Sequence, residues 1–180
     1  MKKIFRPKEF TAVADGTQVS AFLNATDTTP RDEPTAELDQ ISITAGRIAP
    51  GVKSWIHTHP ALTQVTYVVT GTLTVTMKDP REPEPYQLVI PAGSTVVSEP
   101  GTLLQLHNET SHEIEVLYIA SPPYVLETDP YGEVVHEDSI LVAQDWGGLD
   151  TDQWDAYASD AAKRKARRLR ADALKRIATR

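Results

Sequence analysis

Two histidines separated by one residue, His57 and His59, carry the clearest chemistry in the sequence. Residues i and i+2 of a β-strand point to the same face, so both imidazoles would reach one point. An imidazole titrates near neutral pH and can serve as a general acid or base. Gln64 would reach the same point from the neighbouring strand, after a tight turn that contains Pro60. We therefore expect His57, His59 and Gln64 to form one polar site.

The same two-residue alternation predicts the walls of this site. Side chains on the histidine strand, on the Gln64 strand and on a later strand would all face inward. The predicted ligand-binding residues are Lys53, Trp55, Gln64, Thr66, Val68, Leu104 and Leu106. Apolar walls would supply affinity and the polar groups orientation. Lys53 near the mouth could meet an anionic end of the ligand.

A structural role is the alternative for each of these residues. The histidine pair could be packed and hydrogen-bonded inside a core without any chemistry, and Trp55 could be a simple core aromatic. Glu99, His107, His112 and His136 are expected at the surface.

Short segments rich in Val, Ile, Thr and Tyr dominate the middle of the chain and are bounded by Gly, Pro, Asn or Asp, which is typical of strands. The predicted strands are 41–48, 52–59, 64–71, 72–78, 86–90, 94–98, 103–108 and 114–120. Residues 79–86 and 26–35 contain prolines and charges and are expected to be loops. Short strands at this spacing predict a sandwich or barrel.

The end of the chain differs in composition from the rest. Residues 151–180 lack Pro and Gly and are rich in Ala, Arg, Leu and Lys, which favour helix. Nine of the 18 Lys and Arg residues, but one of the 25 acidic residues, fall in 161–180. We therefore predict an acidic barrel domain with an N-terminal arm over residues 1–150 and a basic C-terminal helix over 151–180.

Composition excludes several classes of function. The chain has no cysteine, so disulfides, thiolate catalysis and cysteine-based zinc sites are excluded. No apolar run approaches the length of a membrane span, and the N-terminus lacks the apolar core of a signal peptide. The acidic body argues against nucleic acid as a partner. We expect a cytoplasmic protein, a homodimer, with a small molecule as its ligand.

One stretch resembles the first sequence motif of the cupin family. That motif is G-x5-H-x-H-x3-4-E-x6-G, and Gly51, His57, His59, Gln64 and Gly71 match its spacing throughout. The departure is Gln64, which stands where the family has glutamate.

A later stretch is similar to the second cupin motif, G-x5-P-x-G-x2-H-x3-N, through Gly93, Gly101 and Asn108. Glu99 replaces its proline and Leu104 its histidine. The resemblance implies an all-β fold, the double-stranded β-helix or jelly-roll barrel, over about residues 36–122, followed by the C-terminal α-helix.

In the cupin family the two histidines, the glutamate and the second-motif histidine bind a divalent metal inside the barrel. The resemblance therefore implies a metal site at His57, His59 and Gln64. The loss of a carboxylate and of an imidazole at Leu104 should weaken it substantially. The sequence does not distinguish Zn, Fe, Mn and Ni.

Two classes of function fit these residues. The first is an enzyme acting on a small polar organic molecule, a lyase, isomerase, dehydratase or dioxygenase, with His57 and His59 as catalytic residues, with or without metal. The second is a non-catalytic small-molecule binder or sensor without metal.

Overall fold

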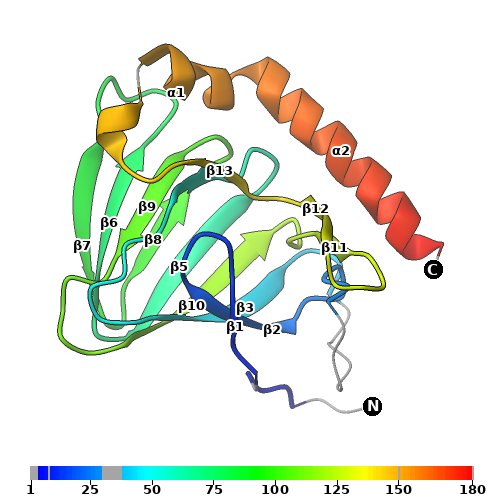
Figure 1. Ribbon diagram of the computed structural model, residues 1–180, viewed down its shortest axis with the longest axis horizontal. Helices are drawn as coiled ribbons and strands as arrows, with labels where there is room; N and C mark the ends of the chain where they lie inside the picture. Colours follow the sequence, from blue (N-terminus) through cyan, green and yellow to red (C-terminus); the bar gives the residue numbers. More distant parts are fainter. Residues whose placement is uncertain (1–3, 8, 30–37, 150, 180) are drawn as a thin grey trace.

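Two antiparallel sheets face each other and form the body of the chain in the computed structural model, which describes residues 4–7, 9–29, 38–149 and 151–179 (Figure 1). The first sheet has the order β1-β2-β3-β10-β5-β8. Its strands are β1 (Thr11–Ala12), β2 (Gln18–Leu23), β3 (Ser42–Ile48), β5 (Thr63–Thr70), β8 (Thr95–Ser98) and β10 (Ile114–Ser121). Neighbouring strands are far apart in sequence, as in a jelly roll.

The second sheet has the order β13-β4-β9-β6-β7. Its strands are β4 (Ile56–Thr58), β6 (Thr72–Lys78), β7 (Tyr86–Pro91), β9 (Leu103–His107) and β13 (Ile140–Ala143). A separate pair, β11 (Leu126–Thr128) with β12 (Val134–Glu137), lies beside the barrel. All strand pairs in the three sheets are antiparallel.

The main core lies between the two sheets and follows from alternation along the strands. On β6, Leu73, Val75 and Met77 are at most 1% exposed and pack in this core. A strand places every second side chain on one face, so these three residues share the inner side. They meet residues of β3, β5, β9 and β10 in the same cluster.

The turn between β5 and β6 requires glycine. Gly71 has a φ of +81°, in the left-handed region that side chains rarely adopt. A Cβ at this position would also lie 3.0 Å from a side-chain atom of Ile114. The motif glycine is therefore needed both for the turn and for the close approach of β10.

The eight predicted strands are present, with one large difference in length. The segment predicted as a strand over 52–59 is a strand only at β4. Residues 52–55 are irregular apart from a single bridge from Lys53 to His107. Strands β1, β2, β11, β12 and β13 lie outside the predicted barrel limits of 36–122. Residues 36 and 37 and most of the predicted loop at 26–35 lie outside the described residues.

The predicted C-terminal helix is two helices, α1 (Thr151–Ala158) and α2 (Asp160–Ala178), preceded by a 3-10 turn η1 (Trp146–Gly148). The break occurs at Ser159, whose hydroxyl accepts a hydrogen bond from the backbone N–H of Ala162 and caps α2. Figure 1 shows the two helices along one side of the barrel, with α2 passing β12. Within the described chain, no helix is long and apolar enough to cross a membrane.

Candidate functional site

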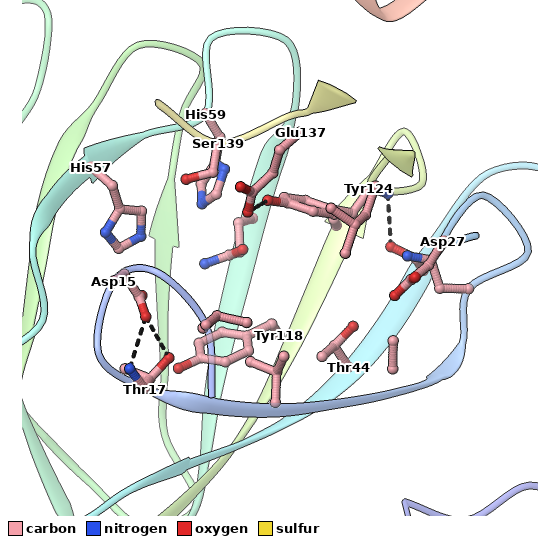
Figure 2. Close-up of a pocket in the computed structure, with 18 of the residues that line it drawn as sticks. Asp15, Thr17, Asp27, Thr44, His57, His59, Tyr118, Tyr124, Glu137 and Ser139 are labelled. Atoms are coloured by element: carbon pink, nitrogen blue, oxygen red, sulfur yellow. Dashed lines mark hydrogen bonds between the residues drawn. The ribbon is translucent and has the colours of Figure 1, made fainter. Parts of the chain in front are cut away.

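A cavity of about 110 Å³ opens into the barrel between the sheets, and His57, His59 and Gln64 all line it (Figure 2). The three side chains are only 5–6% exposed, so they belong to the interior of the barrel. A single water molecule needs roughly 10–15 Å³ of cavity volume, so this cavity has room for a small organic molecule. The sequence prediction of one polar site inside the barrel matches this placement.

Each histidine is oriented by a backbone carbonyl. Nδ1 of His57 lies 3.0 Å from the carbonyl oxygen of Trp55, and Nδ1 of His59 lies 3.3 Å from that of Asp138. A carbonyl only accepts, so each Nδ1 carries the hydrogen and Nε2 of the neutral ring keeps a lone pair. The ring centroids are 5.2 Å apart at an interplanar angle of 75°. The site therefore holds two neighbouring imidazoles whose Nε2 atoms are hydrogen-bond acceptors.

His59 is neutral at physiological pH. Burial and, to a smaller extent, the charge of His57 lower the pKa of His59 to about 3, against the opposing effect of the hydrogen bond to the Asp138 carbonyl. Desolvation disfavours the charged form of a buried imidazole.

Gln64 faces the histidines from β5, but its amide makes a contact within its own strand. Nε2 of Gln64 donates to Oγ1 of Thr66 over 3.5 Å. Thr66 is 2% exposed and is not among the residues that line the cavity. One N–H of the Gln64 amide therefore forms a weak hydrogen bond to the hydroxyl of Thr66.

Three carboxylates that sequence reasoning missed also line the cavity, Asp15, Asp27 and Glu137. Glu137 accepts a hydrogen bond of 2.5 Å from the Tyr124 hydroxyl. Burial raises the pKa of Glu137, and the bond from Tyr124 opposes that shift. Asp15 accepts from the backbone N–H and the hydroxyl of Thr17, over 2.9 and 2.8 Å (Figure 2).

The segments that deliver these carboxylates lie outside both motifs. The turn between β1 and β2 carries Asp15. The backbone carbonyl of Asp15 accepts a hydrogen bond from the N–H of Trp55 over 2.9 Å, which holds this turn against the barrel. The pair Asp15-Gly16, a turn signal between two apolar segments, could have predicted a hairpin here. Glu137, Tyr124 and Ser139 carry no comparable signal, because only the tertiary packing of the segment after β10 brings them to the cavity.

Five of the seven predicted ligand-binding residues do not line the cavity. Leu106 lines the cavity. Leu104 and Val68 also face inward, but they pack in the main core away from the cavity, where they are 2% and 0% exposed. Lys53 is exposed and Trp55 is 37% exposed, and neither lines the cavity. The reason is that β4 begins at Ile56, so the strand alternation that aims His57 and His59 inward does not extend back to them.

Three of the four residues expected at the surface are exposed or partly exposed, and the fourth is largely covered. Glu99 and His112 are exposed, and His107 faces outward beside Glu109. His136 is largely covered, with a side chain 12% exposed and Nε2 3.1 Å from Oδ1 of Asp138.

The donor set does not fit a tight divalent metal site. The two Nε2 atoms suit a metal, since their Nδ1 atoms are held by carbonyls. The third candidate is the neutral amide of Gln64, and the alkyl side chain of Leu104 fills the fourth position inside the core. Among the described residues no three His, Asp or Glu side chains are grouped so that they could hold a metal ion.

Neither a family model nor a curated protein matches the chain in sequence. Solved structures do match it in fold. The cupin domain of Drosophila melanogaster CENP-C superposes with a TM-score of 0.52 at 16% identity, over 63% of this chain and 74% of that one. CapF bound to the inhibitor 3-isopropenyl-tropolone gives 0.52 at 13% identity, over 75% of this chain and 34% of that one.

An oxalate oxidase is similar as well, with a TM-score of 0.50 at 22% identity, over 62% of this chain and 53% of the oxidase. At these identities the likeness concerns the fold alone. The chain has a cupin fold, an all-β double-stranded β-helix with a C-terminal helix.

Proposed function

We propose that this cupin-fold chain binds a small polar organic molecule in the barrel cavity, with His57 and His59 as its working residues and without a tightly held metal. The observation that carries the proposal is the pair of buried imidazoles that line the cavity with Nδ1 atoms held by carbonyls. Two fixed Nε2 acceptors in a partly apolar cavity suit recognition of a small ligand.

Acid–base catalysis is the chemistry that these residues could supply. A neutral imidazole accepts a proton at Nε2 from an O–H or an activated C–H of the ligand, and returns it later in the reaction. The carbonyl at Nδ1 keeps the ring in the orientation and tautomer that this transfer needs. Isomerisation or dehydration of a polar molecule fits such a site, with the histidine nearer the ligand as the base.

A non-catalytic binder or sensor is the second candidate. It is favoured by Leu104, because a packed alkyl group lies where the second motif of the cupin family has a metal ligand. We further propose that the protein works in the cytoplasm as a homodimer. Val89 and Val97, 64% and 50% exposed, are apolar surfaces that a second copy could cover. Sedimentation velocity measures that association.

The test begins with the purified protein as it is isolated. Elemental analysis should find less than one equivalent of transition metal, and mass spectrometry of a denatured extract should reveal any retained small molecule. A panel of small polyols, amines and hydroxy acids is then screened by thermal shift and followed for turnover by NMR.

Site variants decide between the two functions. His57→Ala and His59→Ala should weaken binding of any molecule found, and an enzyme should lose roughly 10²-fold or more in rate. Trp55→Ala is the control, because Trp55 lies outside the cavity. Binding without turnover would favour the sensor. Unchanged affinity and rate in both histidine variants would place the site elsewhere.

A further inference from the structure

The charges around the cavity have one sign. Asp15, Asp27 and Glu137 line it, and the described residues that line it include no Lys or Arg. The described part of the wall therefore presents three carboxyl groups and no ammonium or guanidinium group. An anionic ligand would enter this low-dielectric space against repulsion from these carboxylates.

Several hydrogen-bond acceptors line the cavity. Nε2 of His57 and Nε2 of His59 accept, because each ring gives its hydrogen to a carbonyl from Nδ1. Both rings are more than nine-tenths buried in the cavity wall. The carboxylates of Asp15 and Glu137 add further acceptor oxygens.

Three donors of the cavity wall already have partners. The Thr17 hydroxyl donates to Asp15, the Tyr124 hydroxyl to Glu137, and the Gln64 amide to Thr66. The Tyr118 hydroxyl is buried without a partner among the described residues, so it can donate to a ligand or accept from it. A ligand with N–H donors of its own would satisfy the two Nε2 atoms and the carboxylates.

We infer that the cavity selects a small organic ammonium compound over a carboxylate of the same size. An ammonium group carries three N–H donors and the charge that complements Asp15 and Glu137. The rings of Tyr118 and Tyr124 in the wall also suit a cation. This inference rests on the proposed small-molecule function and gives it a substrate class. It does not use the predicted contact of Lys53 with an anionic end of the ligand, since Lys53 is exposed outside the cavity.

Three probes of one length and different charge test the inference on the full-length protein. They are 4-aminobutan-1-ol, butane-1,4-diol and 4-hydroxybutanoate, titrated by calorimetry at pH 7 and low salt. We expect the amine to bind about tenfold or more tightly than either of the others. Glu137→Gln keeps an acceptor for Tyr124 but removes the charge, and should reduce the preference for the amine several-fold. Glu133→Gln is the matched control, because Glu133 is exposed and does not line the cavity.

The outcomes separate this inference from the function on which it rests. Tighter binding of 4-hydroxybutanoate, or equal binding of the diol and the amine, would overturn the ammonium preference and leave a small-molecule site standing. A preference that survives Glu137→Gln unchanged would also overturn it. Failure of all three probes to bind would contradict the small-molecule site itself.

Discussion

Nε of Arg170 on α2 donates to the buried carboxylate of Asp138 over 2.9 Å. The backbone carbonyl of the same Asp138 accepts from Nδ1 of His59 over 3.3 Å. The neighbouring residues Glu137 and Ser139 line the cavity. The C-terminal helix is therefore tied to the segment that orients a histidine and supplies part of the cavity wall.

Replacing Arg170 by methionine should destabilise the protein. The Asp138 side chain is 1% exposed, so the change leaves a buried carboxylate without its guanidinium. Such losses cost about 3–5 kcal/mol. Asp138 keeps the N–H of Val125 and the ring of His136 as partners, so we expect a value near the lower end, about 3 kcal/mol. Urea denaturation measures it.

The control for this prediction is Arg167→Met on the same helix. Arg167 is exposed, and substitutions at such positions change stability by about 0.5 kcal/mol or less. Equal stability of the Arg167→Met and Arg170→Met proteins would show that the contact between α2 and Asp138 contributes nothing.

Stability should fall as the pH is lowered below about 6, because His59 must remain neutral in the fold. Its pKa of about 3 lies below the ordinary imidazole value of 6.5, so between these values the unfolded chain binds a proton that the folded chain does not. Between pH 7 and pH 5 this costs about 2 kcal/mol. Urea titrations in buffer with EDTA should show a smaller dependence on pH for His59→Gln than for the wild type. His112→Gln, at an exposed histidine, should keep the wild-type dependence.

The sequence predicts the strands of the barrel and the three central residues of the site, because both depend on local alternation. Leu73, Val75 and Met77 are recognisable from β6 alone. His57 lies in β4 and His59 directly follows its last residue, and their two-residue spacing on extended chain places both side chains on one face. Gln64 follows from the short turn that joins β4 to β5.

The parts of the site that could not be predicted depend on tertiary packing. Trp55 has the same parity as His57, but it precedes the first residue of β4 and points outward. Glu137 and Asp15 come from a separate two-stranded sheet and from an N-terminal hairpin. Nothing in the local sequence of these segments indicates that they pack over the mouth of a barrel built from residues far away.

Leu104→Ala should act on the core and not on the ligand. Leu104 is 2% exposed and packs with the main core, without lining the cavity. Truncation of a buried leucine costs about 2–5 kcal/mol. We expect a loss of this size by urea denaturation, with unchanged affinity for any cavity ligand. Leu88→Ala, at a leucine of β7 that is 37% exposed, should cost less than about 1 kcal/mol. Strongly weakened ligand binding in Leu104→Ala would return this residue to the cavity wall.

Gln64→Glu should create a stronger divalent site than the native chain has. The change restores a charged oxygen ligand beside two imidazoles whose Nδ1 atoms are already held by carbonyls. Calorimetric titration of the apo-protein with MnCl₂ or ZnCl₂ should show an affinity at least about tenfold higher than in the wild type, because a carboxylate is a far better ligand for these ions than an amide. Gln87→Glu adds the same charge on the exposed side of β7 and should leave the affinity unchanged. If Gln64→Glu and Gln87→Glu bind the metals alike, residue 64 does not share a site with His57 and His59.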